Sequence, residues 1–198
     1  MLTSITPLGE RGRGNRWGVT TVALIVGCLV AGAAAGALAG GLGALALEGV
    51  GIDARLGLVA AGLAVGLALD LGGGGTRLPT VRRQVNEDWL HAYRGWVYGV
   101  GFGLQLGAGA ATIVGASATY ATFLCSFAAA SLGTGALIGG VFGAMRGAAV
   151  LAAWRVRGPA ELVELGRRLR RWEGRARRFA LLAQAALAVV AVAAAVGA

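Results

Sequence analysis

Glycine recurs at every fourth position in two stretches of an almost uninterrupted apolar region. The first run is Gly95, Gly99, Gly103 and Gly107, and the second is Gly135, Gly139, Gly143 and Gly147. Because a helical turn takes 3.6 residues, each run lies on one face of a helix. A face without side chains lets a second backbone approach closely, which is a main source of cohesion between helices in lipid. The spacing therefore predicts two packed membrane helices within residues 95–147.

The composition indicates that a bilayer is the solvent of this chain. Of its 198 residues, 57% are hydrophobic and 14% are charged, whereas about 25% of the residues in soluble domains are charged. A soluble globule of this length could not bury so much apolar sequence. We therefore predict an all-α fold, a polytopic integral membrane helical bundle that forms a single membrane domain over residues 1–198.

The apolar runs predict five transmembrane helices joined by polar links. The expected spans are residues 17–39, 56–71, 94–116, 121–145 and 179–198. A single helix from Trp17 to Leu47 would be about 46 Å long, more than a hydrocarbon core of about 30 Å. We therefore expect a break near Gly40-Gly41, with residues 40–50 as a turn or a short re-entrant half-helix. The turn between the third and fourth spans is expected at 117–122.

The basic residues predict the orientation of the chain in the membrane. All 18 are arginine, and the net charge is +9. With the N-terminus inside, only Arg55 falls in an outside link, which predicts a cell (inner) membrane protein with a cytoplasmic N-terminus and an outside C-terminus. Basic charge also raises nucleic acid as a partner. Here the arginines gather in the links, which topology and anionic lipid headgroups explain, so nucleic acid is not expected.

Two polar segments predict helices that lie at the membrane surface. These are residues 76–92 and residues 160–178. The second carries an apolar stripe opposite many arginines, which is typical of a helix lying flat on a bilayer. The arginines expected to bind anionic headgroups are Arg167, Arg168, Arg170, Arg171 and Arg175.

Glycine-faced helices favour a function based on packing. A third run, at Gly32, Gly36 and Gly40, repeats the spacing of four. Three such faces exceed what one helical hairpin needs, so we predict a homo-oligomer or a subunit of a larger membrane complex, with a structural or assembly role. A small-solute or ion transporter or channel is an alternative. Its path would contain Asp70 and Gln105, because polar groups at membrane depth are functional candidates.

The two cysteines, Cys28 and Cys125, both lie in apolar runs and suggest a third function. Two thiols in separate spans could form a reversible disulfide. This layout resembles the transmembrane thiol–disulfide electron carriers of cytochrome c biogenesis, which are small glycine-rich bundles with one cysteine in the first span and one in a later span. The resemblance implies that Cys28 and Cys125 carry electrons across the bilayer. That family flanks its cysteines with proline, which is absent here, and a buried cysteine can also act as a small hydrophobe.

Other classes of chemistry find no support in the sequence. There is no Ser-His-Asp set, no phosphate-binding loop and no pair of catalytic carboxylates, so enzyme activity and a cofactor are not expected. Glu87 and His91 lie four residues apart and could share a helix face. Two ligands are too few for a metal site, so no metal is expected.

Overall fold

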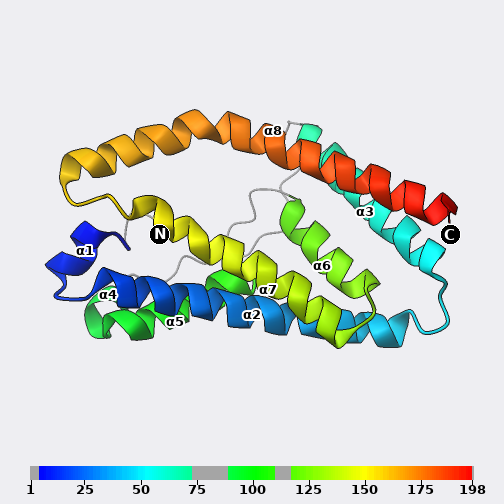
Figure 1. The fold of residues 1–198 in the computed structure, drawn as a ribbon, viewed down its shortest axis with the longest axis horizontal. Helices are drawn as coiled ribbons and strands as arrows, with labels where there is room; N and C mark the ends of the chain where they lie inside the picture. Colours follow the sequence, from blue (N-terminus) through cyan, green and yellow to red (C-terminus); the bar gives the residue numbers. More distant parts are fainter. Residues whose placement is uncertain (1–4, 73–88, 110–116, 198) are drawn as a thin grey trace. The chain divides into compact units, whose positions relative to one another are not determined.

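The computed structural model describes residues 5–72, 89–109 and 117–197, and every element within them is a helix. This confirms the all-α class for these residues. The order along the chain is drawn in Figure 1. The helices are α1 (Pro7–Gly12), α2 (Trp17–Ala46), α3 (Ile52–Leu71), α4 (Trp89–Ala92), α5 (Gly95–Gly107), α6 (Ala118–Ala128), α7 (Leu132–Ala148), the 3-10 helix η1 (Ala149–Ala153) and α8 (Pro159–Gly197).

Four stretches of helix are long and apolar enough to cross a bilayer: α2, α3, α7 together with η1, and α8. These four helices indicate a membrane-embedded protein. The sequence predicted five spans. The described residues do not confirm that count: the span expected at 94–116 contains the 13 residues of α5, with 110–116 outside the described residues, and the span expected at 121–145 contains parts of the 11-residue α6 and of α7. At 1.5 Å per residue, α5 and α6 are about 20 and 16 Å long, too short for a core of about 30 Å.

The chain forms two compact units. Unit 1 comprises the described residues of Met1–Gly32, Arg82–Thr112 and Gly140–Gly174. Unit 2 comprises those of Ala33–Val81, Ile113–Gly139 and Arg175–Ala198. The core of unit 1 contains Ile5, Leu24, Cys28, Leu90, Tyr98, Phe102 and Val150. The core of unit 2 contains Val59, Ala60, Leu63, Ala128 and Ala191.

In unit 1, α5 lies against α2 through its glycine run. A methyl group built on any of three of these glycines would lie within 3.0 Å of a carbonyl oxygen of α2, a separation that real side chains essentially never show. The pairs are Gly99 with Thr20, Gly103 with Leu24 and Gly107 with Cys28. Both numbers in each pair rise together, so the two helices run in parallel.

The second half of α7 also packs closely against α2 in unit 1. A methyl group on Gly143 would meet the carbonyl oxygen of Cys28 and lie 3.3 Å from Cα of Gly32. One on Gly147 would lie 3.0 Å from Cα of Ile25. Because Gly147 lies nearer than Gly143 to the start of α2, α7 runs antiparallel to α2 in unit 1.

In unit 2, glycines again lie where two backbones approach. Gly36 faces the backbone of Gly135, and a methyl group on it would lie 2.9 Å from Cα of Gly139. Gly40 faces the carbonyl oxygen of Ser131 in the same way.

Helix α6 lies antiparallel to α3 within unit 2. Gly66 of α3 lies beside Ser117, at the start of α6, and Gly62 lies beside Leu124, near its end. The last turn of α6 then reaches α2, where Gly43 faces the carbonyl oxygen of Phe127.

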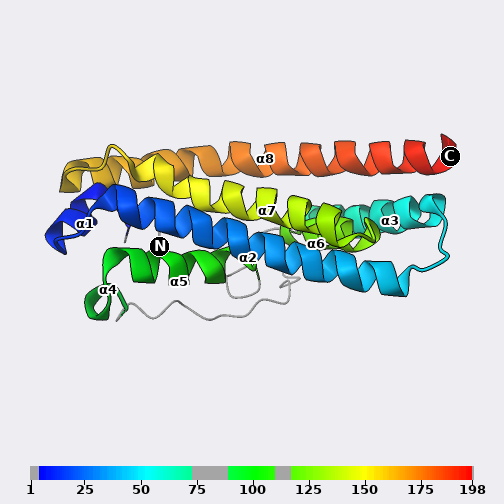
Figure 2. The same cartoon turned by 60° about the horizontal axis from the view of Figure 1, so that its bottom comes forward.

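Helix α2 does not break near Gly40-Gly41 as the sequence predicted. It continues to Ala46, as Figure 2 shows. Gly40 and Gly43 face neighbouring backbone, so the close packing they permit offsets the entropy that glycine loses in a helix. The chain turns later, where Gly49 has a φ of 75°, a left-handed conformation that glycine adopts at little cost.

The turn predicted at 117–122 is wrong for residues 118–122, and residues 110–116 before them lie outside the described residues. Residues from Ala118 onward are already helical, and the chain turns between Ala128 and Leu132. Ala130 has a φ of 49° there, which is uncommon for a residue with a side chain. Alanine is the best helix former, so this turn carries no sequence signal and the span expected at 121–145 is divided between α6 and α7.

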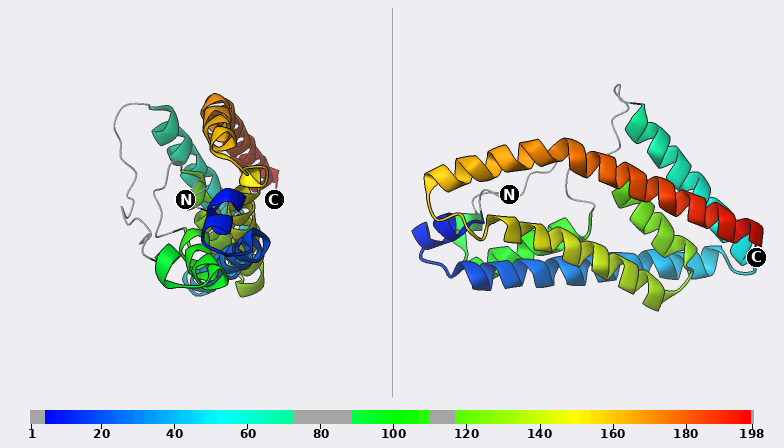
Figure 3. Two further views of the ribbon diagram at one scale, coloured as in Figure 1. Left: turned by 90° about the vertical axis from the view of Figure 1, so that its left-hand side faces the viewer. Right: turned by 45° about the horizontal axis from the view of Figure 1, so that its top comes forward.

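The surface helix predicted at 160–178 and the span predicted at 179–198 form one continuous helix, α8. The right-hand view of Figure 3 shows it along its whole length without a break. No proline lies between Pro159 and Gly197, so nothing prevents the helix from continuing where the sequence changes from charged to apolar. Of the surface helix predicted at 76–92, α4 covers Trp89–Ala92, and 76–88 lie outside the described residues.

Candidate functional site

Residues 5–16, the N-terminal segment, pack against the rest of unit 1 and contain the short helix α1. Thr6 caps α1, its side chain accepting a hydrogen bond from the N–H of Gly9 (3.0 Å), and Pro7 occupies the first helical turn, where its missing N–H costs nothing. The N–H of Leu8 donates to the carbonyl oxygen of Val156 (3.2 Å). The segment that the sequence presents as a polar tail is therefore docked.

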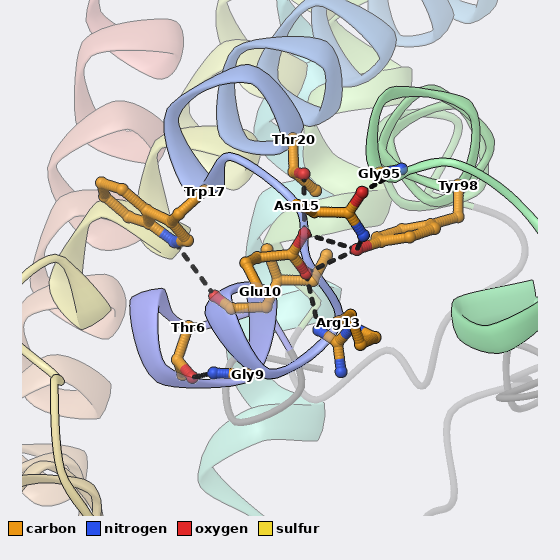
Figure 4. A network of polar contacts seen from close by, with 10 residues as sticks. Thr6, Gly9, Glu10, Arg13, Asn15, Trp17, Thr20, Gly95 and Tyr98 are labelled. Atoms are coloured by element: carbon orange, nitrogen blue, oxygen red, sulfur yellow. Dashed lines mark hydrogen bonds and ion pairs between the residues drawn. The ribbon is translucent and has the colours of Figure 1, made fainter.

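A buried carboxylate forms the centre of the polar network in Figure 4. Glu10 is 0% exposed. It accepts hydrogen bonds from Arg13 Nη2 (2.6 Å), from Thr20 Oγ1 (2.8 Å) and from the hydroxyl of Tyr98 (2.6 and 2.5 Å to its two oxygens). Thr20 belongs to α2 and Tyr98 to α5, so the carboxylate joins the N-terminal segment to two further helices.

Asn15 extends this network to the start of α5. Its Nδ2 donates to the hydroxyl oxygen of Tyr98 (3.2 Å), and its Oδ1 accepts from the N–H of Gly95 (3.3 Å). That N–H is one of those a helix start leaves without a partner. A methyl group on Gly95 would lie 2.5 Å from Thr20 Oγ1, so this glycine makes room for the network. We call Glu10, Arg13, Asn15, Thr20 and Tyr98 the Glu10 cluster.

The charges and hydrogen bonds of the Glu10 cluster favour a stable link between the N-terminal segment and helices α2 and α5. Burial opposes the charge of Arg13, but its hydrogen bonds with Glu10 and Tyr98 outweigh burial and raise its pKa above the ordinary value. Both oxygens of Glu10 accept from protein donors. A buried ion pair is tolerated when further hydrogen bonds satisfy the remaining acceptor positions, as they do here.

A second polar cluster lies in unit 2 and contains the sequence-predicted Asp70. The Asp70 carboxylate accepts from the N–H of Ser117 (3.2 Å) and from its hydroxyl (2.8 Å). The amide Nε2 of the buried Gln184 donates to Ser117 Oγ (3.0 Å) and to the carbonyl oxygen of Leu63 (3.0 Å). We call Asp70, Ser117 and Gln184 the Asp70 cluster. It links α3, the start of α6 and α8.

Two further contacts shape the Asp70 cluster. A methyl group on Gly66 would lie 2.7 Å from Gln184 Nε2 and 2.8 Å from Ser117 Oγ, so this glycine leaves space for both side chains. Arg177 Nη2 donates to the carbonyl oxygen of Asp70 (2.6 Å). Asp70 lies in the last turn of α3, where carbonyl groups lack a partner within the helix and a positive charge from another helix is favourable.

The remaining predicted residues are divided between the two units. Cys28 is buried in unit 1, Cys125 is half-buried in unit 2, and both are free thiols. Gln105 is half-buried on α5 in unit 1, whereas Asp70 belongs to unit 2. Neither pair of candidates therefore falls within a single unit.

The predicted lipid-binding arginines are all exposed on α8. Two of them, Arg168 and Arg171, lie 3.1 and 3.5 Å from Glu164. The hydrogen bond from Arg168 and the charges of nearby arginines lower the pKa of Glu164 below its ordinary value.

Sequence reasoning missed the Glu10 cluster altogether. The usable signals were Thr6-Pro7, a cap followed by proline at the first helical position, and the spacing of three between Glu10 and Arg13. Among the described residues, no group of three or more histidines, cysteines or carboxylates could hold a metal ion. Compared with protein-family models, curated proteins and solved structures, the chain shows no match.

Proposed function

We propose that this chain is a small multi-pass membrane protein with a structural or assembly role, built on glycine-mediated helix packing. One observation carries the proposal. Gly107 of α5 and Gly143 of α7 both face the carbonyl oxygen of Cys28, so three backbones meet at one residue of α2. In lipid, where burial of apolar surface does not drive helices together, such contacts are a main source of cohesion.

The same contacts bear on how a larger assembly would form. The glycine runs face other helices of the same chain, so they are already used within it. The surfaces left for lipid or for partner subunits are apolar faces such as that of α2 carrying the exposed Val19, Val22, Val26 and Val30. We infer that assembly uses such faces. The arginine distribution supports a cytoplasmic N-terminus in the cell membrane.

A pair of glycine variants tests the proposal. Gly103→Leu places a side chain against Leu24 and Cys28 backbone, whereas Gly133→Leu on α7 enters open space. We expect Gly103→Leu to lower the melting temperature in mild detergent, and to reduce any assembly larger than the 19.7 kDa chain only by distorting the α2 and α5 backbones that carry its outer faces. Gly133→Leu should leave both properties unchanged. Equal behaviour of the two variants would contradict the proposal.

Transport is a second candidate because of the Asp70 cluster. The half-exposed Asp70 carboxylate is linked through Ser117 to the buried amide of Gln184, and polar groups that lead from the membrane interface into the apolar region often mark a solute or proton path. In proteoliposomes loaded with a pH-sensitive dye, a transporter would show a proton flux that Asp70→Asn abolishes without lowering the melting temperature. A flux that depends on Asp70 in this way would favour a transporter over a structural role. If the wild-type protein shows no proton flux, proton transport is excluded.

A thiol–disulfide carrier is the third candidate and rests on the resemblance alone. It predicts that Cys28 and Cys125 crosslink when the protein is oxidised, and that replacing either cysteine with serine abolishes electron transfer. Alkylation that finds both thiols free under oxidising conditions would exclude this role.

A further inference from the structure

Helix α8 changes abruptly from charged to apolar sequence at Phe179. The stretch from Phe179 to Gly197 has 19 residues without a charge, which at 1.5 Å per residue is about 28 Å, close to the thickness of a hydrocarbon core. Because α8 is continuous across this boundary, the residues just before Phe179 lie at the depth of the lipid phosphates when the apolar stretch crosses the bilayer.

Two exposed arginines occupy this depth on one face of α8. Arg175 and Arg178 are three residues apart, so their side chains are neighbours on the helix surface. Like charges at this spacing repel each other, and an anion between them relieves the repulsion. The nearby Arg177 donates to the carbonyl oxygen of Asp70, which holds this turn of α8 against the end of α3 within unit 2.

An exposed aromatic ring lies beside this pair. Phe179 follows Arg178 directly, lies four residues after Arg175, and is 75% exposed. A ligand that satisfies both the guanidinium groups and the ring must carry a phosphate next to hydrocarbon. An acidic protein offers the charge without the acyl chain.

We propose that Arg175, Arg178 and Phe179 form a binding site for one anionic phospholipid, with the phosphate held between the two guanidinium groups and an acyl chain against the ring. Arginine suits this role because its planar group forms paired hydrogen bonds with phosphate oxygens. The proposal rests on α8 crossing the bilayer and is independent of the assembly role.

The test compares two double variants of equal charge change. Arg175→Gln with Arg178→Gln removes the site. Arg168→Gln with Arg171→Gln removes two arginines of the same helix that lie about 16 and 12 Å before Phe179, too far from the apolar stretch to share a phosphate at its edge. The full-length protein in neutral detergent is titrated with short-chain phosphatidylglycerol or phosphatidylcholine, and bound lipid is counted by native mass spectrometry.

The wild-type protein should prefer phosphatidylglycerol. At roughly fivefold in affinity for each arginine near the surface, the Arg175/Arg178 variant should lose about 25-fold of that preference, and the Arg168/Arg171 variant should keep most of it. Equal losses in the two variants would overturn the site. The proposal also fails if inorganic phosphate displaces the lipid at equal concentration, or if a polyglutamate peptide binds the same arginines as well as the lipid does.

Discussion

Replacing Glu10 with alanine should release the N-terminal segment from unit 1. The substitution leaves the hydroxyls of Thr20 and Tyr98 without their acceptor, and it removes the partner of Arg13, whose side chain is only 19% exposed. Removing one member of a buried pair costs about 3–5 kcal/mol. Because Arg13 regains water when the segment detaches, we expect the lower end, about 3 kcal/mol, which corresponds to a roughly 100-fold larger detached population.

Limited trypsin digestion measures that population. The segment contains Arg11, Arg13 and Arg16; although Arg11 and Arg16 are exposed, we expect trypsin to cut mainly when the segment detaches and its backbone unwinds. When docking is fast relative to cleavage, the cleavage rate follows the detached fraction. Glu10→Ala should therefore be cut at the N-terminus roughly 100-fold faster than the wild-type protein, while the exposed Glu173→Ala should be cut at the wild-type rate.

A second substitution shows whether the bonds act together. Tyr98→Phe removes only the hydroxyl and should accelerate N-terminal cleavage by about tenfold, since an unsatisfied buried partner costs about 1–3 kcal/mol. Combined with Glu10→Ala it should add little, because the hydroxyl acts through the carboxylate. If Glu10→Ala is cleaved at the N-terminus at the wild-type rate, the Glu10 cluster does not hold the N-terminal segment against α2 and α5.

Three further predictions follow from buried and exposed positions. Gly66→Ala should lower the melting temperature because its methyl group would meet Gln184 and Ser117. The control Gly57→Ala, with open space around it on the same helix, should be neutral or raise the free energy of unfolding by up to about 1 kcal/mol. Equal changes in melting temperature for the two variants would contradict the contact at Gly66. Ser117→Ala should cost about 1–3 kcal/mol by leaving a buried amide and a carboxylate short of a partner, and an unchanged unfolding midpoint would argue against the Asp70 cluster. N-ethylmaleimide should label Cys125 faster than the fully buried Cys28 in the native protein, and equal native rates would contradict the burial of Cys28.

The sequence predicted well wherever hydropathy alone decides the outcome. The apolar runs and the absence of strand patterns indicated helices, and the expected span at 56–71 lies within α3. Hydropathy does not locate turns between residues that all favour helix. Ala128 to Leu132 is such a place, because only the left-handed backbone of Ala130 marks it. The same limit explains the wrong prediction of a helix break at Gly40-Gly41, because from sequence alone a glycine can either end a helix or let it pack closely against a neighbour.

The candidate sites were harder to predict because they join residues distant in sequence. Glu10 and Tyr98 are 88 positions apart, and a glutamate among N-terminal arginines reads as a solvated charge. Asp70 was singled out from the sequence because a carboxylate in an apolar run is unusual. Its partner Ser117 could not be identified, since serine in an apolar run is common and the contact depends on how α6 lies along α3.

The glycines that face the α2 backbone restrict which amino acids evolution can place at their positions. Glycine is the only residue without a Cβ, so every amino acid replacement at Gly103, Gly107 or Gly143 adds an atom where a carbonyl oxygen already lies. No conservative substitution exists at these positions. At Gly57 and Gly133 an added methyl group has no atom of the described residues within 4 Å, so these positions are free to change. Among descendants of a common ancestor, the first three should stay fixed while alanine, serine and larger residues accumulate at the other two.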